Sequence, residues 1–95
     1  MNKYEIMMIL KPDLEDDAKN AVLDGFKAIL TEGEGVVDNV DTEKLGLREL
    51  AYEIKDYTKG LYVVIDTHTT PEAIAEFERL SRINASVLRH LTLRK

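Results

Sequence analysis

Several kinds of residue are absent or scarce in this sequence of 95 residues, and each absence removes a class of function. There is no cysteine, which excludes disulfide bonds, thiolate metal sites and a cysteine nucleophile, and which fits a reducing compartment. No apolar run approaches the roughly 18 residues that a membrane-spanning helix needs. The N-terminal stretch MNKYEIMMILKPD lacks a signal-peptide cleavage site. We therefore expect a cytoplasmic protein.

Positive charge is also scarce, except at the end of the chain. Residues 1–78 hold 8 basic and 18 acidic side chains, a balance of −10. From Arg79 onward there are five basic side chains and no acidic one, a balance of +5. The overall charge of −5 argues against a polyanionic partner only if the cations are dispersed in the fold.

What is present is the composition of one globular domain. The chain is 44% hydrophobic and 33% charged, and its length suits a single domain over residues 1–95. Alternating or β-branched apolar residues predict strands, and apolar residues three and four positions apart predict helices. We expect four strands, at 3–10, 34–54 with a bend near 41–46, 61–69 and 86–95, and two helices, at 13–30 and 70–82. Asp13 and Thr70 are the predicted N-caps.

The segment 45–64, LGLRELAYEIKDYTKGLYVV, fits two structures. Leu47, Leu50, Ala51 and Ile54 have helical spacing, but Leu50, Tyr52 and Ile54 also alternate as in a strand. A helix between Gly46 and the turn-like KDYTKG would have only about two turns and would be marginal. A strand there would instead form a hairpin with the following strand.

The resulting fold class is α+β. The order β-α-β-β-α-β is the ferredoxin-like split βαβ arrangement, with two helices on one face of a four-stranded antiparallel sheet. The first strand and the strand at 61–69 would be central, and the other sheet face would be open. Tyr4, Ile6, Met8 and Leu10 would face the helices with Val63 and Ile65. On the last strand, Val87 would share a face with Arg89 and Leu91.

No pattern indicates catalysis. The two histidines, His68 and His90, lie 22 residues apart without metal-ligand spacing. The acidic residues near Asp13 suit the first turn of a helix, because carboxylates there complement the helix dipole. The EGEG at 32–35 follows a helix and lacks the GK[ST] of a phosphate loop. We expect no enzyme activity, metal, cofactor or small-molecule substrate.

The basic C-terminal segment is the main functional signal. Clustered on one side of the fold, away from the acidic residues, its cations would neutralise RNA phosphates even on an acidic protein. Asn84 and His90 would add hydrogen bonds. The alternative is a solvated edge strand, which lysine and arginine protect from aggregation. The predicted cluster comprises Arg79, Arg82, Arg89, Arg94 and Lys95.

The open sheet face carries a second signal. An RNA recognition motif stacks bases on aromatic residues of its two central strands. Here those positions hold Met7 and Ile9 beside Tyr62, so we do not expect that platform. With Val64 these residues form a predicted apolar patch that would bind a protein partner. Weakly apolar surface without a partner is the alternative.

Three stretches, KYEIMMILKPDL, LGLRELAYEIKDYTKGLYVV and FERLSRINASVLRHLTLRK, resemble the bacterial small ribosomal subunit protein six family. The resemblance runs from Lys3 to Lys95. Its most specific part is G-x-R-x-L-A-Y, which is Gly46, Arg48, Leu50, Ala51 and Tyr52 here.

The resemblance implies a non-enzymatic ribosomal protein with the fold derived above. Such a protein binds the central domain of the small-subunit ribosomal RNA as a heterodimer with small-subunit ribosomal protein eighteen. The basic partner would supply much of the phosphate neutralisation. The expected RNA contacts are Lys3, Arg48, Arg79, Arg82, Asn84, Arg89, His90, Arg94 and Lys95, and the expected partner contacts are Met7, Ile9, Tyr62 and Val64.

Two other functions are compatible with the same fold. The first is a ligand-sensing or self-associating ferredoxin-like domain, which would pair its open sheet face with a second copy. The second is an enzyme of the acylphosphatase type, which would need an anion-binding loop after the first strand. The LKPDLED stretch there offers acids instead.

Overall fold

The computed structural model describes residues 2–95, except for the side chains of residues 43–45. The predicted order of strands and helices is confirmed, and the ferredoxin-like fold with it. Among the described residues, neither helix has the length and apolar character that a membrane crossing requires. The elements are β1 (Asn2–Leu10), α1 (Asp16–Leu30), β2 (Val36–Ile54), β3 (Tyr57–Thr69), α2 (Pro71–Ile83) and β4 (Val87–Arg94).

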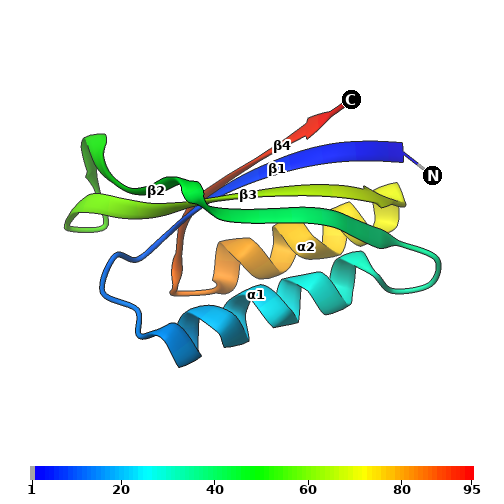
Figure 1. Cartoon of the computed structure of the whole chain (residues 1–95), viewed down its shortest axis with the longest axis horizontal. Helices are drawn as coiled ribbons and strands as arrows, with labels where there is room; N and C mark the ends of the chain where they lie inside the picture. Colours follow the sequence, from blue (N-terminus) through cyan, green and yellow to red (C-terminus); the bar gives the residue numbers. More distant parts are fainter. Residues whose placement is uncertain (1) are drawn as a thin grey trace.

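The four strands form one antiparallel sheet in the order β2-β3-β1-β4. β1 and β3 are therefore central, as the sequence predicts, and β2 and β4 are the edges. Both helices cover one face of the sheet, and the two chain ends lie near the same end of the molecule (Figure 1). None of the described residues forms a helix on the opposite face, and we call it the open face.

The 45–64 segment is a strand and a hairpin, not a helix. β2 runs to Ile54 and pairs with β3, which begins at Tyr57. Lys55 and Asp56 form the turn, with φ of 48° and 71°. Two successive positive φ values are typical of a type I′ turn, whose twist matches that of the paired strands. The pairing is irregular between Asp41 and Gly46, where a bend is predicted, and again between Glu49 and Ile54.

The two helices begin in different ways. Thr70 caps α2 as predicted, because its Oγ1 accepts a hydrogen bond of 3.2 Å from the Ala73 N–H. The prediction that Asp13 caps α1 is wrong. Glu15 is the N-cap residue, with extended backbone and no side-chain cap hydrogen bond. Asp13 instead accepts a hydrogen bond from the Tyr57 hydroxyl at 3.4 Å, so its carboxylate points to the hairpin.

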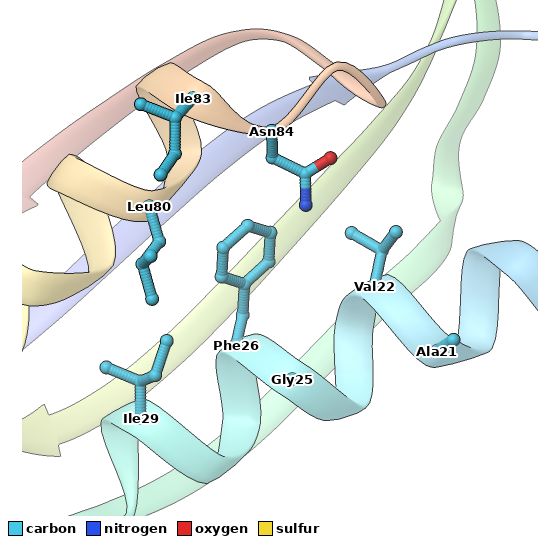
Figure 2. A pocket seen from close by; sticks show the side chains of 8 residues that line it. All are labelled: Ala21, Val22, Gly25, Phe26, Ile29, Leu80, Ile83 and Asn84. Atoms are coloured by element: carbon cyan, nitrogen blue, oxygen red, sulfur yellow. The ribbon is translucent and has the colours of Figure 1, made fainter.

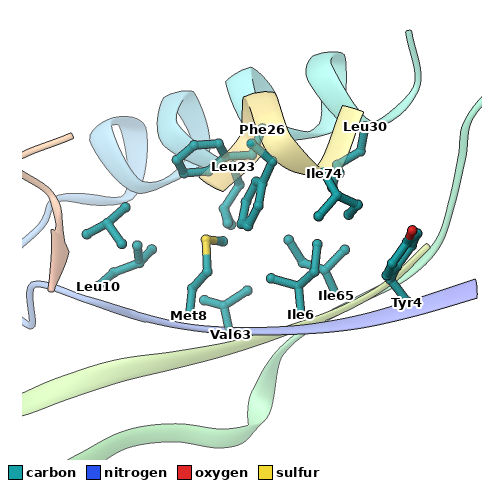
Figure 3. Packing of buried hydrophobic residues seen from close by; sticks show 12 residues of the cluster. Tyr4, Ile6, Met8, Leu10, Leu23, Phe26, Leu30, Val63, Ile65 and Ile74 are labelled. Carbon is teal, nitrogen blue, oxygen red and sulfur yellow. The ribbon is translucent and has the colours of Figure 1, made fainter. Parts of the chain in front are cut away.

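The core lies between the helices and the sheet (Figure 3). Phe26 of α1 and Phe77 of α2 meet edge to face, with ring centroids 5.0 Å apart, a favourable geometry for aromatic pairs. Burying such apolar side chains provides most of the driving force for folding. The buried cluster comprises Tyr4, Ile6, Met8, Leu10, Leu23, Phe26, Leu30, Val63, Ile65, Ile74, Phe77 and Val87.

The start of β4 departs from simple alternation. Val87 pairs with Leu10 and Arg89 pairs with Ile9, so Leu88 is an extra residue in β4. The prediction that Val87 shares a face with Arg89 is therefore wrong. The irregularity turns Val87 into the core and leaves Arg89 on the open face, because one inserted residue shifts the alternation.

Candidate RNA and partner surfaces

The seven lysines and arginines among the predicted RNA contacts lie in three separate places. Arg79 and Arg82 are on α2, in the helix layer. Lys3, Arg94 and Lys95 are at the end of the sheet where the chain termini lie. Arg48 and Arg89 are on the two edge strands, towards the hairpin turn. The expected cluster on one side, away from the acidic residues, is therefore wrong.

The two arginines of α2 contact glutamates one turn away. Arg79 forms an ion pair with Glu76 and donates a hydrogen bond from Nε to the Glu76 carboxylate at 3.0 Å. Arg82 lies 3.5 Å from a Glu78 carboxylate oxygen. Both arginine side chains are at least 60% exposed, and exposed ion pairs of this kind contribute little to stability. Their guanidinium groups could therefore exchange the glutamates for phosphates at small cost.

Lys95 contacts both central strands at the end of the sheet. Its ammonium lies 3.0 Å from a Glu5 carboxylate oxygen on β1 and 3.7 Å from Asp66 on β3. Its backbone N–H donates to the Lys3 carbonyl at 2.8 Å. The hydrogen bond and charge of Glu5, followed by Asp66, raise the pKa of Lys95 above 10.5. The cation at the chain end is thus partly neutralised.

Two further contacts complete this end of the molecule. Arg94 donates a hydrogen bond to the Asn2 side-chain oxygen at 3.1 Å. His68 of β3 pairs through Nδ1 with the Asp38 carboxylate of β2. The His68–Asp38 pair is not predictable from local pattern, because the residues are 30 positions apart. Positive and negative side chains therefore alternate across this region, which makes a poor isolated phosphate site.

Asn84 and His90 have structural surroundings. Asn84 is the C-cap residue of α2, and its side-chain oxygen accepts a hydrogen bond from the Ser86 N–H at 2.9 Å. His90 lies opposite Met8 on the helix-covered face, with its ring centroid 6.2 Å from that of Phe77. His90 therefore lies on the face opposite to that of its neighbour Arg89.

Arg89 connects the two edge strands across the open face. Its guanidinium carbon lies 5.2 Å from the centre of the Tyr52 ring, a cation–π contact between opposite edges of the sheet. Lys55 in the turn also donates to the Val87 carbonyl at 3.4 Å. The end of the β2–β3 hairpin therefore reaches across to the start of β4. In Figure 1, the green part of β2 near the turn rises on the side away from the helices.

This hairpin changes the expected partner surface. Met7, Tyr62 and Val64 are half-buried on the open face. The prediction that Ile9 is exposed is wrong, because its side chain is only 9% accessible. The Ile9 methyl group Cγ2 and the Leu50 methyl group Cδ2 both lie close to Gly60. Leu50 belongs to the hairpin, so the hairpin helps to cover Ile9.

Two leucines extend the apolar patch towards the edge of the sheet. Leu91 and Leu93 of β4 are 55% and 51% exposed, and Leu91 pairs with Met7. A hollow of about 230 Å³ lies among Met7, Ile9, Tyr62, Arg89 and Leu91. Their alternation in β4 could have identified both leucines as partner candidates.

A larger hollow, of about 380 Å³, lies between the two helices on the opposite side of the molecule. Val22, Phe26 and Ile29 of α1 face Leu80 and Ile83 of α2 across it (Figure 2). Ile83 is 70% exposed at its edge. No charged side chain is among the described residues that line this hollow, so it suits an apolar contact and no acid–base chemistry.

Comparison with known proteins identifies the family. The family model described as ribosomal protein S6 matches residues 3–94. The crystal structure of 30S ribosomal protein S6 from Thermotoga maritima is similar to this chain, with a TM-score of 0.87 and 29% sequence identity. The similarity covers 99% of this chain and 87% of the Thermotoga chain. The chain therefore belongs to the ribosomal protein S6 family, whose members are non-enzymatic proteins of the small ribosomal subunit.

Proposed function

We propose that this chain binds the central domain of the small-subunit ribosomal RNA as a heterodimer with small-subunit ribosomal protein eighteen. The observation that carries the proposal is the family match over residues 3–94, which includes all of β2, β3 and β4 and all but the first residue of β1. The net charge of −5 supports the need for a basic partner, because RNA binding requires neutralisation of phosphates.

The proposed RNA contacts differ in how readily they would bind phosphates. Arg89 is exposed and has an aromatic ring as its neighbour, and Arg48 is exposed on β2 and also has a partner within the protein. Arg79, Arg82 and Arg94 would exchange exposed protein partners for phosphates. Lys3 and Lys95 would act beside Glu5 and Asp66, so we assign them a smaller contribution. Asn84 and His90 already have structural contacts within the protein, so any contact with RNA would be additional to these.

The open face is the proposed partner surface. Met7, Tyr62 and Val64 form it together with Leu91 and Leu93, and the buried Ile9 lies beneath it. The hollow of about 230 Å³ is smaller than most small-molecule sites and suits a single apolar side chain from a protein. Such anchors in pockets carry most of the energy of protein interfaces.

Charge reversal of β4 tests the RNA assignment. In a heterodimer with Arg89→Glu and Arg94→Glu, binding to a central-domain RNA fragment should weaken. The slope of log affinity against log salt should fall by about 0.7 to 0.9 for each phosphate that the variant no longer neutralises. The matched control is Lys19→Glu with Lys27→Glu, which changes the net charge equally but on α1. Equal affinity and salt slope in the β4 variant and the wild type would rule out these contacts.

A second pair of variants tests the partner surface. Leu91→Asp should weaken heterodimer formation by about tenfold or more in sedimentation or calorimetry, because it places a charge in an apolar contact. Leu47→Asp is the control, because Leu47 is 57% exposed but pairs with Leu61 on the other face. Equal effects of the two substitutions would argue against docking on the open face.

A further inference from the structure

Tyr52 is a large aromatic residue that the fold holds in an exposed position. It is 57% exposed and lies on the irregular part of β2, between Glu49 and Ile54. The Arg89 guanidinium lies over its ring at 5.2 Å. The hydrogen bond from Lys55 to β4 ties the same hairpin down. The ring is therefore positioned by contacts from two strands that are far apart in the sequence.

The layer next to Arg89 is packed and apolar, because Arg89 pairs with Ile9 of β1. Ile9 is 9% exposed, and the space above Gly60 is filled by Ile9 Cγ2 and Leu50 Cδ2. A side chain larger than hydrogen does not fit at Gly60 without displacing them. Arg89, which lies over the Tyr52 ring, is thus next to a closely packed apolar layer.

We propose that Tyr52 and Arg89 form a stacking site for one unpaired base of the ribosomal RNA. This inference rests on the proposed function and specifies the kind of RNA element that would bind at the end of the β2–β3 hairpin, beside the partner surface. Unpaired bases stack on aromatic rings and on guanidinium planes, and neighbouring cations hold the adjacent phosphates. Arg89 supplies both a plane and a charge. The site differs from an RNA recognition motif, because it lies at the hairpin and not on the central strands.

The surroundings of Tyr52 favour RNA over an apolar protein anchor. Glu49 and Glu53 of the same strand are exposed, and carboxylates are depleted at the centre of protein interfaces. The apolar hollow among Met7, Tyr62 and Leu91 is the better place for a protein side chain. Arg89 lines that hollow as well, so it lies at the border between the two surfaces.

The test uses the heterodimer and a central-domain RNA fragment in which unpaired adenines are replaced one at a time by 2-aminopurine. Stacking on Tyr52 should quench the fluorescence of one substituted position. Tyr52→Leu should restore that fluorescence and weaken binding about 5- to 150-fold, which is the usual effect of removing one stacked base. The salt slope should stay unchanged, because no phosphate contact is removed. Tyr52→Phe should retain both the affinity and the quenching.

Two controls separate stacking from a change in structure. Leu47→Ala alters an equally exposed apolar residue of β2 and should leave both readouts unchanged. Arg89→Lys retains the charge but lacks the guanidinium plane, so it should lower affinity without changing the salt slope. This variant tests the site independently if Tyr52→Leu lowers the melting temperature.

Three results would refute the stacking site, and they differ in what they imply for the proposed function. Wild-type affinity of Tyr52→Leu for the fragment would overturn the stacking site and leave the proposed function standing. Weaker heterodimer formation with unchanged RNA contact would show that Tyr52 is a protein anchor. Absence of RNA binding by the wild-type heterodimer would refute the proposed function, and the stacking site with it.

Discussion

Gly60 offers a direct test of how the hairpin packs on the open face. It is buried in β3, opposite Arg48 of β2. A Cβ atom there would lie less than 3.0 Å from Ile9 Cγ2 and 3.3 Å from Leu50 Cδ2. Carbon atoms normally approach to about 3.5–4.0 Å, so Gly60→Ala requires Ile9 to move.

The expected magnitude follows from what Ile9 can do. Its Cγ2 is attached to Cβ, so only a rotation about χ1 or a backbone shift moves it. Overpacking of this kind costs about 1–3 kcal/mol. Replacing glycine by alanine also lowers the conformational entropy of the unfolded chain, which stabilises the folded protein by about 0.4–1 kcal/mol. We therefore expect Gly60→Ala to lower the free energy of unfolding by about 1–2 kcal/mol.

A double-mutant cycle with Ile9→Ala identifies the cause. Ile9→Ala removes the obstructing methyl group, and alone it should cost about 2–4 kcal/mol because Ile9 is buried. In that background Gly60→Ala should cost nothing or be slightly stabilising, which gives a coupling energy of about 1–3 kcal/mol. Equilibrium unfolding in urea measures all four proteins, with unchanged m-values as a check on two-state behaviour.

Additive effects in this cycle, within about 0.5 kcal/mol, would refute the reasoning. They would mean that Ile9 is not what limits the space at Gly60, and the explanation for its burial would fail. Unaltered stability of Gly60→Ala would contradict it equally.

Three further predictions use other parts of the fold, each measured as the free energy of unfolding. Gly25→Ala should raise the free energy of unfolding by about 0.5–1 kcal/mol, because alanine favours helix and a Cβ at this position in the middle of α1 meets nothing within 4 Å. A decrease in stability would contradict the open space beside Gly25. Asp56→Gly should raise the free energy of unfolding by about 0.5–1 kcal/mol, because φ is 71° at this turn position, and no gain would show that aspartate is unstrained there. Lys95→Met should lower stability below pH 10.5, because Glu5 raises the pKa of Lys95 in the folded state, and the difference should vanish as pH rises through that raised pKa. A difference that persists in strong alkali would exclude the ion pair as its source.

Most of the fold was predictable from the chain. Alternation along 3–10 and 61–69 identified the buried faces of β1 and β3, and Thr70 followed by Pro71 marked the start of α2. The 45–64 segment was predictable only by weighing a marginal helix against a hairpin. Asp13 was misjudged because its carboxylate accepts a hydrogen bond from Tyr57, 44 residues away, and does not cap the helix.

The candidate surfaces were less predictable. Charge counting identified the cations of the C-terminal segment but not their neighbours. Glu76 and Glu78 lie one helical turn from Arg79 and Arg82, a spacing that was visible in the sequence. The contact of Arg89 with Tyr52 and that of Lys95 with Asp66 were not visible, because β4 meets β2 and β3 only through the folded sheet.

The sequence by itself determined the element order, the faces that form the core and the family resemblance. Those properties depend on the local periodicity of apolar residues and on short motifs, which need no knowledge of distant contacts. Only the tertiary structure decided that Ile9 is buried, that Val87 joins the core and that the cations lie in three places, two of which also hold carboxylates. Strand register, one extra residue in β4 and the path of the hairpin across the open face set those contacts, and they arise only when the whole sheet has assembled.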